Sequence, residues 1–177
     1  FAHEVEAASP VGGKARALAQ MTGSDLPIPE WFVVLPSAFE ASLAAPMRGG
    51  LDATNARRFV LEMRLAADVA AEVDTALAGL AQGDGYYAVR SSALEEDSVK
   101  HSFAGQLESA IGVARRDVAA KIVEIWASGF SERLLRYRRE AGLDAWAGAP
   151  AVIVQRMIEG EASGVAFSAD PVSGRRA

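Results

Sequence analysis

The stretch AVIVQRMI, residues Ala151–Ile158, predicts a central β-strand. Its run of apolar and β-branched residues is typical of a strand that is buried on both faces. Two further apolar runs, Trp31–Leu35 and Tyr86–Val89, also predict strands. Weaker strand candidates lie within Phe103–Val113 and at Gly164–Ser168.

Helical periodicity fills most of the sequence between these strands. The glycine pair Gly12-Gly13 forms a loop that feeds a helix reaching about Met21, and Ala38–Ala45 predicts a short helix. Thr54–Leu80 predicts an amphipathic helix, continuous or interrupted, and Arg116–Glu140 a single long helix. Strands and helices alternate without a regular βαβ rhythm, so the predicted fold class is α+β.

Composition excludes several kinds of function. The 177 residues contain 18 Lys plus Arg and 23 Asp plus Glu, which gives a net charge of −5. This acidic balance does not indicate the basic surface by which proteins bind nucleic acid. The absence of cysteine excludes disulfides, thiolate metal sites and a cysteine nucleophile. His3 and His101 are too few for a multi-histidine metal centre. No apolar stretch is long enough to span a membrane. We therefore expect a soluble, cytoplasmic protein, and the start at Phe1 without Met indicates a fragment.

Gly12-Gly13-Lys14 at a helix start has the character of an anion site. Glycines let a ligand approach the backbone closely, and the exposed N–H groups of the first turn favour phosphate. The spacing matches neither a P-loop nor a dinucleotide fingerprint. A plain glycine loop that caps the helix is the alternative interpretation of the motif.

Arg90-Ser91-Ser92 is a sharper signal, because it presents a guanidinium and two hydroxyls where a strand meets a loop. The fork of an arginine side chain matches phosphate oxygens and stays charged at any working pH. The alternative is a surface ion-pair network between Arg90 and Glu95, Glu96 or Asp97. Those three acids could equally restrain the loop or lie near a metal–phosphate complex.

Three other features receive structural interpretations. His101 is taken as an ordinary polar residue. The arginines near the end of the last predicted helix either bind anions or form a solvated helix face; they are Arg133, Arg136, Arg138 and Arg139. The core is expected to contain Trp31, Phe32, Phe59 and Phe167.

Seven motifs in their order along the chain resemble the nucleotide-binding domain of the family that contains pyruvate phosphate dikinase, phosphoenolpyruvate synthase and rifampicin phosphotransferase. They are Gly12-Gly13-Lys14, Leu26–Val34, Ala88–Ala93 with Glu96-Asp97, Ser102–Gln106, Trp126-Ala127-Ser128, Val154–Met157 and Ser163–Pro171. The resemblance covers almost the whole chain. It implies an incomplete ATP-grasp-like domain over residues 1–177, its N-terminal portion, with lobes at about 1–82 and 83–177.

The resemblance also implies binding roles for five residues. Lys14 and Arg90 would contact ATP phosphates, Gly105 would let the backbone approach the nucleotide, Ser109 would offer a hydroxyl, and Gln155 would lie at the nucleotide pocket. ATP and Mg²⁺ are the implied cofactors, and neither a catalytic residue nor a metal ligand is assigned in this chain. The chain departs from the family pattern at Ala15, often glycine, and at Ser109, often threonine.

The implied parent is an ATP-dependent phosphotransferase with further domains. It would split ATP to AMP and pass the β-phosphoryl group through a histidine of another domain to pyruvate; this fragment alone would lack turnover. One alternative keeps the ATP chemistry but uses a rifamycin or another small alcohol as the acceptor. The other is a non-catalytic nucleotide-binding or scaffold domain.

Overall fold

The computed structural model describes residues 10–22, 24–43, 55–80, 85–93, 108–140, 149–165, 167, 169–170 and 174–175. The first half of the chain contributes helices and one strand: α1 (Gly12–Met21), β1 (Trp31–Val34), α2 (Pro36–Ser42), α3 (Ala56–Glu62) and α4 (Ala67–Leu80). The second half contributes β2 (Tyr86–Ser92), β3 (Ser109–Ala114), the 3₁₀ turn η4 (Arg115–Asp117), α5 (Val118–Ser128), α6 (Glu132–Glu140) and β4 (Ala151–Arg156).

The four strands form one antiparallel sheet in the order β1-β4-β2-β3. This arrangement confirms the α+β class, and β4 lies inside the sheet as its apolar run predicted. The sheet joins segments that are far apart in sequence, since β1 pairs along its whole length with β4. Strand alternation therefore decides which side chains of distant segments share a face.

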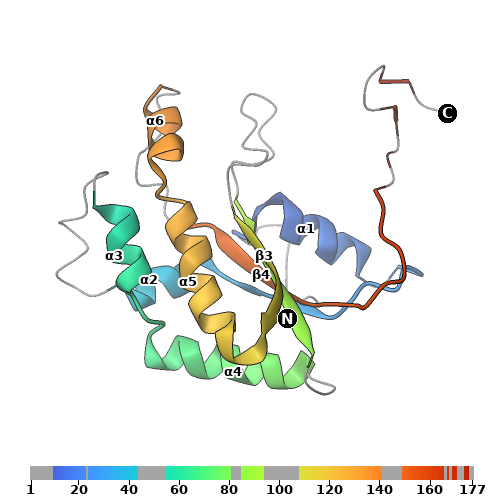
Figure 1. The fold of residues 1–177 in the computed structure, drawn as a ribbon, viewed down its shortest axis with the longest axis horizontal. Helices are drawn as coiled ribbons and strands as arrows, with labels where there is room; N and C mark the ends of the chain where they lie inside the picture. The colour runs from blue at the N-terminus through green and yellow to red at the C-terminus, as the bar shows by residue number, and fades with distance from the viewer. Residues whose placement is uncertain are drawn as a thin grey trace.

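The two faces of the sheet have different covers (Figure 1). One face carries Phe32, Tyr87, Val89, Val152 and Val154, which pack with apolar side chains of α2, α3, α4 and α5 into the main core. Within it, Phe39 lies edge-on to Trp126, with ring centroids 5.4 Å apart. The other face carries Trp31 and Ile153 and is covered by α1 through Val11 and Ala15. The sheet is thus a wall between a large core and a smaller one under α1.

Several sequence expectations about elements are corrected. The helix expected over residues 116–140 is two helices, because the chain turns at Gly129–Ser131 between α5 and α6. Of the two forms left open for the helix over residues 54–80, the structure has the interrupted one, since α3 ends at Glu62 and α4 begins at Ala67. The described part of Gly164–Ser168 is not a strand; residues 157–165 run away from the sheet in extended form (Figure 1).

The four aromatic residues expected in the core differ in how deeply they are buried. Trp31 and Phe32 are buried, whereas Phe59 is only partly buried and the side chain of Phe167 is 65% exposed. Phe167 follows an extended segment that packs on neither core, so its aromatic ring stays in solvent. Among the described residues no helix is long and apolar enough to cross a membrane.

Candidate functional site

Arg90, Ser109 and Gln155 lie on one face of the sheet. Arg90 is directly opposite Ser109 on β3 and opposite Ile153 on β4. Gln155 is two residues beyond Ile153 and therefore on the same side. Because Ile153 packs against α1, this is the face that α1 covers. The three residues come from three different strands, and only the sheet register brings them together.

α1 brings Lys14 to the same place. The Lys14 ammonium donates a hydrogen bond to the Ser91 carbonyl oxygen at 3.4 Å, so it lies beside the residue that follows Arg90. Both cations are half-buried. A lysine from a helix and an arginine from a strand thus converge at the end of β2, although 76 positions separate them in sequence.

The close contact depends on Gly12. The backbone of Gly12 has φ +72°, and a Cβ atom built on it would lie 2.5 Å from the Ser92 carbonyl oxygen. Such a separation is far inside van der Waals contact, so only glycine lets the start of α1 approach β2 this closely. The glycine pair is therefore the first turn of α1 itself, packed on the strand, rather than a loop ahead of the helix.

The hydroxyls of Ser91 and Ser92 are not presented to solvent, which corrects the expectation drawn from the Arg90-Ser91-Ser92 motif. Ser91 and Ser92 are 0% and 1% exposed. Ser92 shares the face of Arg90, and its oxygen accepts the Ala15 N–H at 3.1 Å. Ser91 points to the main core, where its hydroxyl has no hydrogen-bond partner among the described residues. Of this motif, only the arginine is half-exposed on the α1 face.

Gln155 and Ser109 occupy the margins of this face. The Gln155 side-chain amide donates to the Pro29 carbonyl oxygen at 3.2 Å, which ties β4 to the segment before β1. Ser109 is exposed at the start of the edge strand β3. The preceding Glu108 carboxylate lies 3.9 Å from the Arg57 guanidinium, and the Glu108 carbonyl oxygen accepts the Ser91 N–H at 3.4 Å.

The other candidate residues lie away from this face of the sheet or outside the described residues. Arg138 is buried and donates to the Gly129 carbonyl oxygen at 3.3 Å, so it supports the turn between α5 and α6. The positions of Gly105, His101 and the acids Glu95, Glu96 and Asp97 lie outside the described residues. Within the described ranges no group of three His, Asp or Glu side chains could hold a metal ion.

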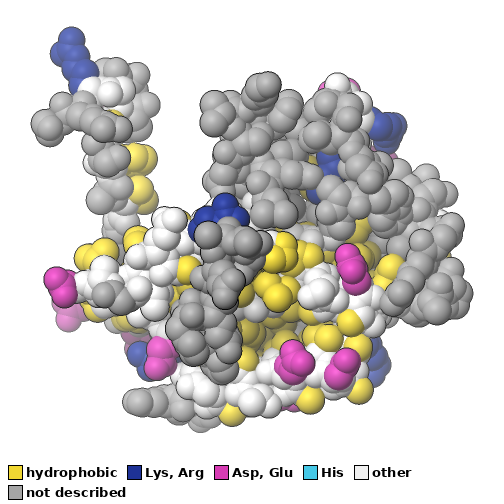
Figure 2. Space-filling model, turned by 180° about the vertical axis from the view of Figure 1, so that it is seen from behind, with side chains coloured by type: hydrophobic (Ala, Val, Ile, Leu, Met, Phe, Trp, Pro, Cys, Tyr) yellow, Lys and Arg dark blue, Asp and Glu magenta, His cyan; other side chains and the backbone are white. Residues whose placement is uncertain are grey.

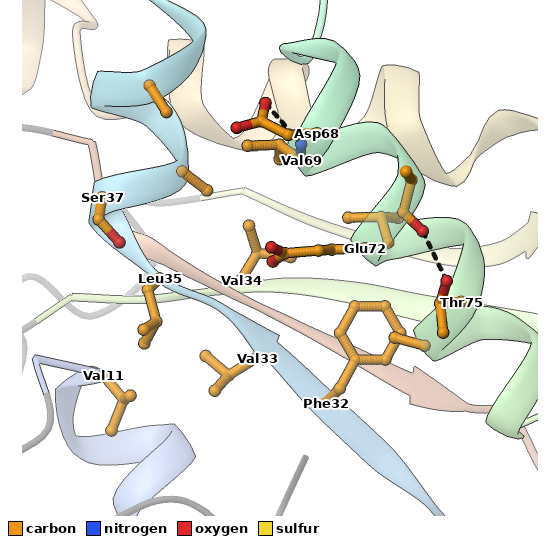
Figure 3. Close-up of a pocket in the computed structure, with 15 residues that line it drawn as sticks. Val11, Phe32, Val33, Val34, Leu35, Ser37, Asp68, Val69, Glu72 and Thr75 are labelled. Atoms are coloured by element: carbon orange, nitrogen blue, oxygen red, sulfur yellow. Dashed lines mark hydrogen bonds between the residues drawn. The ribbon is translucent and has the colours of Figure 1, made fainter.

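A pocket of about 760 Å³ lies between β1, α2 and α4 and reaches Val11 at the start of α1 (Figure 3). Its lining is mainly apolar, and its charged groups are the carboxylates of Asp68 and Glu72. The Asp68 carboxylate accepts the N–H of Val69 at 2.9 Å. Figure 2 shows the same combination on the back of the molecule, with hydrophobic side chains at the centre and acidic ones beside them. Carboxylates repel a polyphosphate, so this pocket does not suit a phosphorylated ligand.

Sequence reasoning missed the pocket, because its lining comes from separate elements with no common motif. It also missed the role of Ser92. That residue could have been found, since strand alternation places it on the face of Arg90 and sends Ser91 to the opposite face.

Comparison with known proteins gives one family and several relatives. Residues 8–177 match the family described as pyruvate phosphate dikinase, AMP/ATP-binding domain. The chain is 37% identical over 168 residues to the prodigiosin synthesizing transferase PigC of Serratia marcescens, covering 93% of this chain and 19% of the relative. It is 38% identical over 164 residues to a rifampicin phosphotransferase of Streptomyces sviceus, covering 91% and 18%.

A phosphoenolpyruvate synthase of Pyrococcus furiosus is 32% identical over 170 residues, covering 93% of this chain and 21% of the relative. The chain therefore spans about a fifth of the length of the relatives it matches.

Proposed function

Because the chain belongs to the family of pyruvate phosphate dikinase AMP/ATP-binding domains, we propose that the α1 face of its sheet holds ATP within a larger, dikinase-type phosphotransferase. The membership confirms the resemblance predicted from the motifs. In the proposal, Lys14 and Arg90 bind the phosphates, Ser109 offers its hydroxyl, Gln155 borders the nucleotide, and Gly105 lets the backbone approach it. The domain would be the N-terminal portion of an ATP-grasp-like unit in a cytoplasmic protein.

The single observation that carries this proposal is the convergence of Lys14 and Arg90 at the end of β2. A polyphosphate carries charge along its length, so cations from two directions hold it better than one side chain does. The arginine fork fixes two oxygens in a plane, and the lysine ammonium adds a compact charge with three donors. Ser92 and Gly12 hold the two elements at fixed separation, so the cations are oriented before the ligand arrives.

Mg²⁺ fits this half of the site poorly as a resident ion. The described ranges contain no cluster of carboxylates that could hold a metal. Mg²⁺ prefers carboxylate and phosphate oxygens, and in kinases it usually keeps contact with the phosphates of the substrate. We therefore include Mg²⁺ as the counter-ion that accompanies ATP and assign no residue of this chain to it.

The whole protein would split ATP to AMP and pass the β-phosphoryl group through a histidine of another domain to an acceptor. Pyruvate is the first candidate acceptor, because phosphoenolpyruvate synthases are among the relatives. A rifamycin or another small alcohol is the second candidate, because the rifampicin phosphotransferases reach 36–38% identity against 32% for the synthases. In this proposal the acceptor binds to another domain, so both candidates place ATP on the same residues of this chain.

The nucleotide product tests the reaction class. The full-length protein is incubated with Mg²⁺ and ATP, with pyruvate or rifampicin added separately, and the nucleotides are separated by anion-exchange chromatography. We expect AMP to accumulate, faster with one of the two acceptors. Formation of ADP without AMP would contradict the dikinase chemistry. No acceptor-dependent turnover, despite saturable ATP binding, would favour the non-catalytic alternative.

A further inference from the structure

Ser92 connects the two elements that carry the phosphate-binding cations. It lies two residues after Arg90 on β2, and its buried oxygen accepts the N–H of Ala15, which follows Lys14 in the first turns of α1. The two residues are 77 positions apart in sequence, so this is a tertiary contact rather than a local cap. This hydrogen bond therefore joins the residue after Lys14 to the residue two positions after Arg90.

The residue directly before α1 supplies no side-chain cap. This N-cap residue is Val11, whose side chain makes no capping hydrogen bond. A helix begins with backbone N–H groups that lack an intrahelical partner, and these are normally satisfied by a Ser, Thr, Asp or Asn just before the helix. In this chain the hydroxyl of Ser92 on β2 accepts the N–H of Ala15, the fourth residue of α1. This contact ties the orientation of α1 to β2.

Two further contacts act on the same two-residue segment. The Gly12 backbone packs against the Ser92 carbonyl, and the Lys14 ammonium donates to the Ser91 carbonyl oxygen at 3.4 Å. Gly12, Lys14 and Ala15 thus all contact Ser91-Ser92, the residues that directly follow Arg90. Two side-chain groups take part, the Lys14 ammonium and the Ser92 hydroxyl, and the hydroxyl is too deeply buried to reach a ligand.

We propose that Ser92 is a positioning residue, which sets the separation of Lys14 and Arg90 without touching the nucleotide. This inference rests on the proposed function, because it assumes that phosphates bind between those two cations. A misplacement of about 1 Å at a charged site is costly to binding. Loss of the hydroxyl lets α1 shift on β2, so it weakens the hold on the phosphates and leaves the rest of the nucleotide unaffected.

The test measures three ligands by calorimetric titration of the full-length protein: ATP, inorganic tripolyphosphate and adenosine. For Ser92→Ala we expect about fivefold weaker binding of ATP and tripolyphosphate, the scale of one buried hydrogen bond, and unchanged binding of adenosine. The Ser92→Cys side chain is close in size and accepts hydrogen bonds weakly, so its affinity for ATP and tripolyphosphate should fall between those of the wild type and Ser92→Ala. This variant replaces Ser92→Ala if Ser92→Ala does not fold.

Ser131→Ala is the matched control. The Ser131 hydroxyl accepts the Leu134 N–H at 3.4 Å at the start of α6, so this variant also removes a serine contact at a helix start, but away from the site. It should bind all three ligands as the wild type does. Wild-type tripolyphosphate affinity in Ser92→Ala, or an equal loss for adenosine, would overturn the inference. If Arg90→Ala kept wild-type ATP affinity, the proposed function would fail first, and the inference with it.

Discussion

Replacing Arg90 by alanine is expected to weaken ATP binding by about 10- to 100-fold. A hydrogen bond to a charged group contributes about 1.5–3 kcal/mol, and each ~1.4 kcal/mol is a tenfold change in the dissociation constant. Arg90 is half-buried on the α1 face, where screening by water is weaker than at the surface. Its loss leaves Lys14 as the phosphate cation from one direction only. Calorimetric titration of the full-length protein with ATP measures the effect.

Two variants make the Arg90 result specific. Arg90→Lys keeps the charge but loses the planar fork, so its ATP affinity should fall between those of the wild type and Arg90→Ala. Arg64→Ala removes an exposed arginine between α3 and α4 and should leave the affinity unchanged. Equal losses in Arg90→Ala and Arg64→Ala would mean that only the overall charge matters. An Arg90→Ala protein that binds ATP normally would remove the phosphates from this face.

Gly12→Ala is expected to destabilise the domain by about 2–5 kcal/mol, a large share of the ~5–15 kcal/mol that stabilises a typical domain. Two costs add. A left-handed backbone costs a residue with a Cβ roughly 1–2 kcal/mol. The new methyl group would also overlap the Ser92 carbonyl, and such overpacking costs typically ~1–3 kcal/mol. Urea denaturation of the full-length protein measures the change.

The chain contains controls that separate these two costs. Gly112 has φ +70° but nothing within 4 Å of a Cβ, so Gly112→Ala carries the backbone cost alone, about 1–2 kcal/mol. Gly85 has neither feature, and Gly85→Ala should change stability by less than ~0.5 kcal/mol. If Gly12→Ala and Gly112→Ala lost equal stability, the close approach of α1 to β2 would contribute nothing.

Local patterns predicted the strands of the sheet better than the interruptions of the helices. The turn between α5 and α6 had a readable signal, because Gly129 ends one helix and Ser131 caps the next through the Leu134 N–H. The interruption before Ala67 had none, since neither glycine nor proline lies in Met63–Ala66. There the Ala66 N–H donates to the Ser42 hydroxyl on α2 at 3.0 Å, a tertiary contact that no local pattern contains.

The candidate site was predictable as a set of residues but not as a geometry. Lys14, Arg90, Ser109 and Gln155 came from the family resemblance, and strand alternation alone could place Arg90 and Ser92 on one face. The sheet order and register decide that Ser109 and Gln155 share that face. Gly12 was expected to let a phosphate approach the backbone closely, whereas in the structure it lets the backbone of β2 approach. Such contacts depend on how two distant segments pack, which one sequence does not specify.

Hydrogen exchange of the full-length protein with and without ATP tests the central claim most directly, because it locates the ligand on the chain. We expect ATP to slow amide exchange in peptides that cover the start of α1 and the end of β2, where Lys14 and Arg90 converge. Exchange in α4, which lines the acidic apolar pocket, should not change. Protection confined to α4 and β1, with none in α1 and β2, would contradict the account.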